Sequence, residues 1–114
     1  MNQKDFNQTV KARIRQTESL LLKKGKEYAG KEREGFDRLR SFKDGASFLK
    51  ETPKQCLMGF TTKHLTAIVD FVERDAKGEY ISHEQWDEKI GDVIAYMHIL
   101  EAIVVEGLHE AADV

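Results

Sequence analysis

The sequence predicts an all-α protein, an antiparallel helical bundle of three main helices with a short connecting helix. Three observations support this prediction. Apolar residues recur at spacings of three and four over long stretches, which is the helical period. Two segments, residues 52–55 and 82–85, have the composition of helix-capping boxes. No stretch shows the sustained alternation of apolar and polar residues that is typical of a half-buried strand.

The composition is typical of a helix-rich globular protein. The chain has 114 residues, of which 40% are hydrophobic and 33% charged, and this length suits a single helical domain over residues 1–114. Its one cysteine, Cys56, excludes an intramolecular disulfide and agrees with a reducing compartment. The first residues lack the apolar region of a secretory signal, and no apolar run is long enough to cross a bilayer. We therefore expect a cytoplasmic protein without a membrane partner.

The first long helix should cover residues 3 to about 25. It carries an apolar stripe and has a glycine, Gly25, near its end. Residues 24–36 then hold three glycines and seven charged residues, which favours a loop or a broken helix. The stripe consists of Phe6, Val10, Ile14 and Leu21, widened by Leu20 and Leu22.

A short helix should follow over residues 36–49, interrupted by Gly45. The second long helix should begin with Thr52 as N-cap and Pro53 at its first position, and Gly78 should close it. Its inward face is predicted to consist of Leu57, Phe60, His64, Ile68, Phe71 and Val72.

The third long helix should begin at the capping box of Ser82 and Gln85. We expect Gly107 to end it and the tail, residues 108–114, to be frayed. Its predicted apolar stripe is Trp86, Ile90, Val93, Met97, Leu100 and Val104.

Two carboxylates interrupt the apolar surface of this third helix. Glu88, Asp92 and Tyr96 follow one another at intervals of one turn, with Asp92 inside the apolar arc and Glu88 at its rim. Two like charges one turn apart repel, whereas Mg²⁺ binds one or two protein carboxylates together with substrate phosphates. The alternative is a structural aspartate that is paired with Lys63, Arg74 or a helix end.

The second helix and the charged segment contain further candidates. His64 lies near the centre of an apolar face, where a lone histidine is more often a core residue than a ligand, and Lys63 lies at the rim. In residues 24–36, lysines such as Lys26 could attract phosphate and Tyr28 could stack on a base, although each also fits a solvated loop.

Charge is unevenly distributed along the chain. Residues 1–40 carry 11 Lys and Arg against six Asp and Glu, whereas residues 41–114 carry seven against 14. The basic half could attract phosphates and the acidic half could hold cations, or both could be solvated helix faces. The basic residues alternate with acidic ones, so sequence-specific nucleic-acid binding is not expected. Neither a dinucleotide-binding turn nor a P-loop is present in the sequence.

Three stretches carry a resemblance to a known family. They are KGKEYAG after the first helix, KHLTAIVDFV on the second and EKIGDVIAYMHILEAI on the third. In this order they resemble small phage and prophage proteins of the nucleotide-modification-associated domain family. That family is similar to the all-α, MazG-like nucleoside triphosphate pyrophosphohydrolases, which are oligomeric helical bundles that hold Mg²⁺ with carboxylates.

The resemblance implies a role for particular residues. Glu88 and Asp92 would be catalytic metal ligands for Mg²⁺, and Glu27 would be a further ligand. The nucleotide would be contacted by Lys26, Tyr28, Lys63 and Tyr96, to which we add His64. The chain departs from the MazG-like pattern at Lys89, where a second acid is usual, and in having Asp70 and Glu73 instead of a cluster of three glutamates on the second helix.

Three functions therefore stay open. The leading one is a Mg²⁺-dependent nucleotide pyrophosphohydrolase or a related nucleotide-modifying enzyme. The second is a protein that binds and sequesters nucleotides or signalling nucleotides without hydrolysing them. The third is a structural helical bundle. The wide apolar stripes also predict a homo-oligomer.

Overall fold

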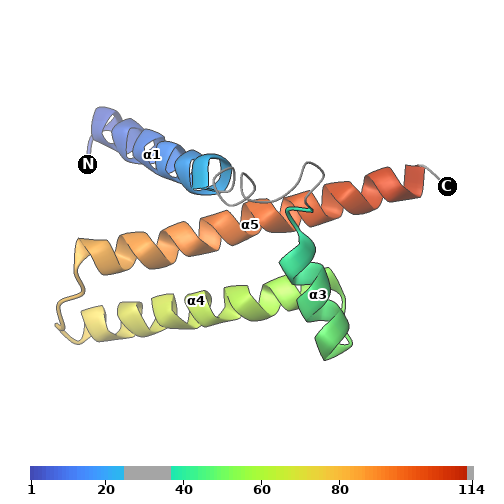
Figure 1. Ribbon diagram of the computed structural model, residues 1–114. Coiled ribbons are helices and arrows are strands. Elements are labelled where there is room, and N and C mark those ends of the chain that lie inside the picture. The colour runs from blue at the N-terminus through green and yellow to red at the C-terminus, as the bar shows by residue number, and fades with distance from the viewer. Residues whose placement is uncertain (25–36, 113–114) are drawn as a thin grey trace. The chain divides into compact units, whose positions relative to one another are not determined.

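The computed structural model describes residues 1–24 and 37–112, and within them all regular secondary structure is helical (Figure 1). The prediction of an all-α fold is confirmed. The chain forms two compact units, Met1–Arg38 and Leu39–Val114.

The first unit contains helix α1, Gln3–Glu18, which continues as one turn of π-helix, Ser19–Lys24. The side chain of Asn2 caps α1 by accepting a hydrogen bond from the backbone N–H of Asp5, at 2.8 Å. The predicted end of this helix, near residue 25, lies outside the described residues. Its apolar stripe is largely exposed, with Phe6 at 55% and Ile14 at 58%.

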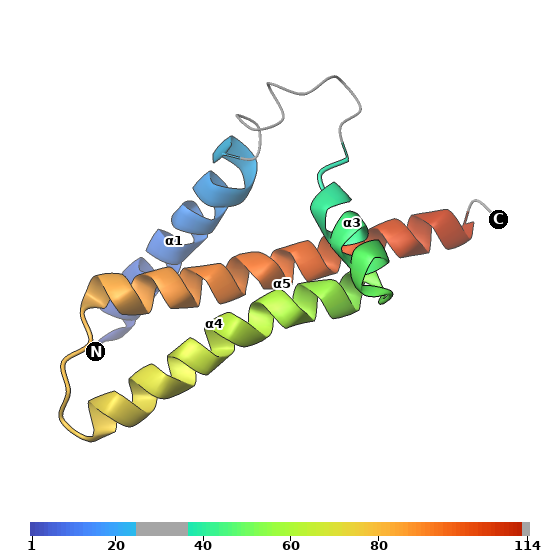
Figure 2. The same cartoon turned by 60° about the horizontal axis from the view of Figure 1, so that its bottom comes forward.

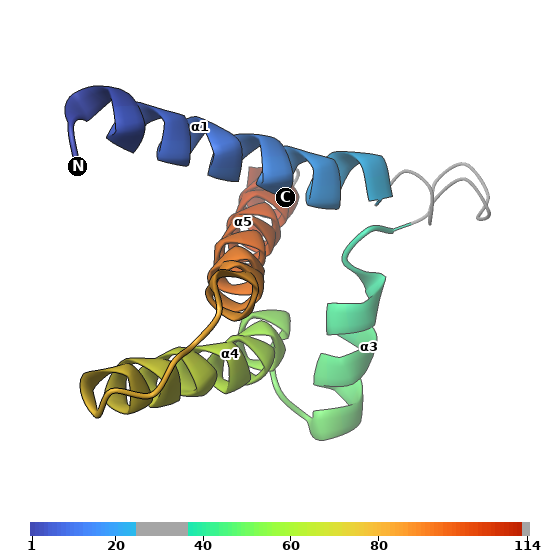
Figure 3. The same ribbon diagram turned by 90° about the vertical axis from the view of Figure 1, so that its left-hand side faces the viewer.

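The second unit is a helical hairpin with a third helix packed at one end. Helices α4, Pro53–Ala76, and α5, His83–Ala112, run antiparallel and side by side (Figures 1 and 2). The short helix α3, Arg40–Leu49, packs against the beginning of α4. Figure 3, a view nearly along α5, shows α4 and α3 as separate neighbours of that helix. An ion pair of 2.7 Å between Lys43 and Glu106 also connects α3 to α5.

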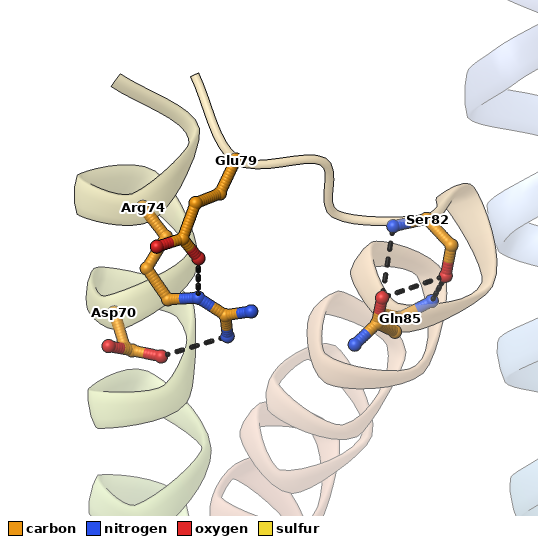
Figure 4. A network of polar contacts seen from close by, with 5 residues as sticks. All are labelled: Asp70, Arg74, Glu79, Ser82 and Gln85. Atoms are coloured by element: carbon orange, nitrogen blue, oxygen red, sulfur yellow. Dashed lines mark hydrogen bonds and ion pairs between the residues drawn. The ribbon is translucent and has the colours of Figure 1, made fainter. Parts of the chain in front are cut away.

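Both predicted capping boxes are present. At the start of α4, Gln55 N–H donates to the Thr52 hydroxyl at 3.2 Å, and Thr52 N–H donates to the Gln55 side chain at 2.9 Å. Ser82 and Gln85 exchange the same pair of hydrogen bonds at the start of α5 (Figure 4). Each box satisfies two backbone N–H groups that have no partner within the helix.

Gly78 ends α4 as predicted. Its φ of +88° is in the left-handed region, where a glycine has no steric penalty. Gly78 N–H donates to the carbonyl of Asp75, and Glu79 N–H donates to that of Arg74, each at 3.0 Å. This is the Schellman arrangement, which reverses the chain immediately after the helix.

An ion-pair network accompanies this turn. Arg74 Nε donates to Glu79 at 2.7 Å, and Arg74 Nη1 lies 3.4 Å from Asp70 (Figure 4). The hydrogen bond to Glu79, followed by that to Asp70, raises the pKa of Arg74 above its ordinary value. The network is exposed, so it holds the turn in place more than it adds to stability.

The hydrophobic core lies where the three helices meet. Leu57 is fully buried and packs with Leu39 and Ile103. Thr61, also fully buried, donates its hydroxyl proton to the carbonyl of Leu57 at 2.9 Å, so its polar group is satisfied. The half-buried residues packed around this core are Phe42, Tyr96, Ile99 and Leu100.

The face of α5 that packs agrees only in part with the predicted stripe, of which Trp86 contacts Phe71 and Leu100 packs on the core. Ala95 and Ile103 are buried, whereas Ile90, Met97 and Val104 are between 38% and 39% exposed. Helix α5 is apolar around most of its circumference, so its pattern alone did not indicate which side faces α4.

Two predicted interruptions are wrong. Gly45 lies inside α3, and Gly107 lies inside α5, which continues through Ala112 instead of fraying from residue 108. A glycine within a helix costs only about 1 kcal/mol relative to alanine, so helical neighbours can carry the helix through it. At Gly45 there is also a packing reason, because a Cβ atom there would lie 2.9 Å from Cys56 Sγ.

We expect Gly45→Ala to destabilise the protein by about 1 kcal/mol, since an overpacking cost of about 1–3 kcal/mol outweighs the gain in helix propensity. Gly59→Ala is the matched control, because no atom lies within 4 Å of its Cβ position, and it should stabilise α4. Urea denaturation of both variants measures the difference. In a Cys56→Ala background the Gly45→Ala change should become neutral or stabilising; persistence of the loss would contradict the packing explanation.

Candidate functional site

His64 and Asp92, the two polar residues predicted to interrupt apolar helix faces, lie next to each other in the hairpin. His64 of α4 and Asp92 of α5 are both half-buried, and His64 Nδ1 lies 3.3 Å from Asp92 Oδ2. His64 is fourteen residues before Gly78 and Asp92 is fourteen residues after it. In an antiparallel hairpin of two α-helices with the same rise per residue, residues equally far from the turn lie opposite each other. The site is thus positioned by the turn.

The contact is close but it is not a hydrogen bond. His64 Nδ1 is fully shielded from solvent and has no hydrogen-bond partner within the described residues. The distance to Asp92 would suit an ion pair if the histidine were protonated, but the contact does not meet the geometry of a hydrogen bond. A buried ring nitrogen is left without a partner beside a carboxylate.

Aromatic rings flank this pair on one side. The ring of Tyr96, one turn after Asp92, lies 5.3 Å from that of His64 and 6.5 Å from that of Phe60, between centroids. Phe60 contacts Phe42 edge to face at 6.0 Å. Burial raises the pKa of the Tyr96 hydroxyl, and the charge of Asp92 raises it further.

The charged candidates lie at the edge of the site. Lys63 is exposed, with Nζ 5.8 Å from the centroid of the Phe60 ring, at the distance of a cation–π contact. Glu88 is exposed on α5, one turn before Asp92.

The structure thus brings together His64, Asp92 and Tyr96. Lys63 lies over the ring of Phe60, which in turn stacks with Tyr96. Residues 25–36 lie outside the described part of the chain, and with them the candidates Lys26, Glu27 and Tyr28.

The alternative interpretation of Asp92, a structural aspartate paired with Lys63 or Arg74, is not what the structure has. Arg74 pairs with Glu79 and Asp70, and Lys63 lies over an aromatic ring. In the described parts of the chain the one close partner of Asp92 is His64.

The side chains around Asp92 can be compared with the ligands that the expected Mg²⁺ would need. Across residues 1–24 and 37–112, no three His, Cys, Asp or Glu side chains are grouped so that they could hold a metal ion together. Asp92 and Glu88 are carboxylates, the ligand type that Mg²⁺ uses together with phosphate oxygens and water. Among the described residues, no protein atom hydrogen-bonds to His64 Nδ1 beside Asp92.

The pairing of His64 with Asp92 could not be found from either helix alone. The sequence feature that could have predicted this pairing is their equal distance from Gly78. Phe60 and Tyr96, which also stack on each other, are each eighteen residues from Gly78.

No family model, curated protein or solved structure matches this chain. The resemblance to the nucleotide-modification-associated and MazG-like families therefore stays a prediction based on three short motifs. In residues 1–24 and 37–112, no helix combines the length and apolar character that a membrane span requires.

Asp92→Asn should lower the pKa of Tyr96 but leave it above the ordinary value, because burial is the larger cause of the shift. NMR titration of ¹³C-labelled tyrosine, with Tyr96→Phe to assign the signal, measures this. Glu101→Gln, an exposed change of the same charge on α5, should have almost no effect. An unchanged pKa in Asp92→Asn would show that the two groups do not interact.

Proposed function

We propose that the protein binds a nucleotide through Mg²⁺ held at Asp92 and Glu88, and that it acts as a nucleotide pyrophosphohydrolase or a related nucleotide-modifying enzyme. One observation carries the proposal: Asp92 is a half-buried carboxylate with no lysine or arginine partner among the described residues, beside a histidine nitrogen that also lacks a partner. Isolated polar groups in such positions are costly and are concentrated at functional sites.

Each residue of the site has a task in this proposal. Asp92 and Glu88 hold the cation, which when bound supplies neutralisation of phosphate charge. Lys63 attracts the phosphates from the rim, while Tyr96 and His64 form the wall next to Asp92.

A second candidate is a protein that binds and sequesters nucleotides without hydrolysing them. The observation that favours it is the lack of a group of three metal-binding side chains in the described residues, since hydrolysis needs a carboxylate to orient water in addition to the metal ligands. A structural helical bundle is the third possibility, and it leaves the polar pair without a purpose. In each case we place the protein in the cytoplasm, that of the host if it is phage-encoded.

Thermal denaturation with a panel of nucleotides separates these functions. At about ten times Kd, a nucleotide with Mg²⁺ should raise Tm by about 5 °C or more. Asp92→Asn should abolish the Mg²⁺-dependent part while the stability of the ligand-free protein stays level, because Asp92 makes no aligned hydrogen bond. Glu101→Gln is the charge-matched control and should respond like the wild type.

The outcomes differ between the candidates. Phosphate or pyrophosphate release together with the shift supports an enzyme, and a shift without release supports a binding protein. No shift with any nucleotide would refute both. A large loss of ligand-free stability in Asp92→Asn would instead assign a structural role to this carboxylate.

We further expect a homo-oligomer, because α5 exposes a line of apolar residues on the side away from the core. Light scattering at micromolar concentration should give a mass above that of one chain. Met97→Glu, on the exposed face, should lower that mass without unfolding the protein. A monomeric wild type would refute this expectation. The exposed apolar residues are Ile90, Met97, Val104, Val105 and Leu108.

A further inference from the structure

We propose that a second copy of this chain packs on an apolar face that α4 and α5 form together, so that two helical hairpins make a four-helix bundle. The inference rests on the expected homo-oligomer and goes beyond it, because it assigns the interface to both helices and gives it two-fold symmetry. We call this surface the hairpin face. Its members are Met58, Leu65, Val69 and Val72 of α4 and Ile90, Met97 and Val104 of α5.

Exposed apolar residues recur at intervals of seven on both helices of the hairpin. The positions are 58, 65 and 72 on α4 and 90, 97 and 104 on α5. A seven-residue repeat is typical of helices that pack lengthwise against a neighbour. Each helix already packs within the second unit through other residues, such as Leu57 on α4 and Ile103 on α5. The second line on each helix therefore indicates a further helical neighbour, and all seven members are between 38% and 56% exposed.

The two lines lie on the same side of the hairpin. Each residue of an α-helix is rotated by about 100° from the one before, so the α4 line lies about 80–140° round its helix from His64, which faces α5. The α5 line lies about 120–160° round its helix from Asp92, which faces α4. Both helices are right-handed and they run antiparallel, so the same sense of rotation leads to the same side. The lines are thus neighbours, with the half-buried residues Val93 and Leu100 between them.

Helix α3 occupies the opposite side of the hairpin. Its contacts, Phe42 with Phe60 and Lys43 with Glu106, involve residues that lie about 40° round from His64 and Asp92 in the other sense. Helix α3 therefore leaves the hairpin face uncovered within the described residues of the second unit, in agreement with the exposure of its members.

The composition and size of the hairpin face favour a second copy as its occupant. All of its members are aliphatic or methionine, so the same surface on a second chain offers apolar side chains without a charge to desolvate. From Met58 to Val72, α4 rises by about 21 Å, and two helices side by side are about 20 Å wide, so the face covers on the order of 400 Å². A patch of this size marks an interaction site, but a two-fold contact through it is smaller than that of a tightly bound dimer. We therefore expect a dimer that dissociates in the micromolar range.

Analytical ultracentrifugation of the full chain tests the contribution of α4. The wild type should show a monomer–dimer equilibrium at micromolar concentration. Val69→Glu places a charge in the α4 half of the hairpin face and should raise the dimer Kd at least about tenfold, as Met97→Glu should in the α5 half. Phe48→Glu is the matched control, because Phe48 is exposed on α3 outside the hairpin face, and its Kd should equal that of the wild type. Circular dichroism checks that each variant keeps its helices.

The wild type alone can overturn the proposal, so the test does not depend on a variant that folds. In a sample that mixes ¹³C-labelled and unlabelled chains, intermolecular NOEs should connect methyl groups of the hairpin face, those of Leu65 and Val69 included. A monomer refutes the proposal, whether the face is then open or covered by another part of the same chain. A dimer whose intermolecular NOEs exclude the methyl groups of α4 also refutes it but leaves the expected homo-oligomer standing. Asp92 and Glu88 lie outside the hairpin face and no nucleotide is present, so the nucleotide-binding proposal is judged separately.

Discussion

The register between α4 and α5 is the constraint on which the second unit depends. It is set at Gly78, whose positive φ ends α4 and reverses the chain, and α5 restarts at the capping box of Ser82. A residue in one helix then meets the residue at nearly the same distance beyond the glycine. Phe71 and Trp86, seven and eight residues away, illustrate this near the turn, with ring centroids 5.4 Å apart. A shift of one residue in the turn would rotate each helix by about 100° against its partner.

The chemistry of the site follows from the same register. Neither His64 nor Asp92 has a partner on its own helix among the described residues, so each depends on the opposite helix for its surroundings. Tyr96 extends the contact by one turn, and the charge of Asp92 contributes to the raised pKa of its hydroxyl. The exposed residues Lys63 and Glu88 lie on the same two helices. The hairpin therefore positions a polar pair with charged residues at its edge, without requiring α3 to take part.

Features of the fold that depend on neighbouring residues in the sequence were predictable. Features that depend on contacts between helices were not. Caps and the helix end at Gly78 depend on residues within a few positions of each other, and these predictions were confirmed. Gly45 and Gly107 were misjudged because a lone glycine weakens a helix without ending it. The packed face of α5 and the meeting of His64 with Asp92 depend on the other helix. They could be predicted only by combining both helices with the register of the turn.

The composition of the hairpin interface argues that its polar pair has a function. Elsewhere along this interface the helices meet through apolar or satisfied groups, such as Leu57 and Thr61. Apolar side chains of similar volume at the positions of His64 and Asp92 would bury more apolar surface and leave no nitrogen unpartnered. The stability of the hairpin therefore gains nothing from a buried nitrogen that has no partner among the described residues.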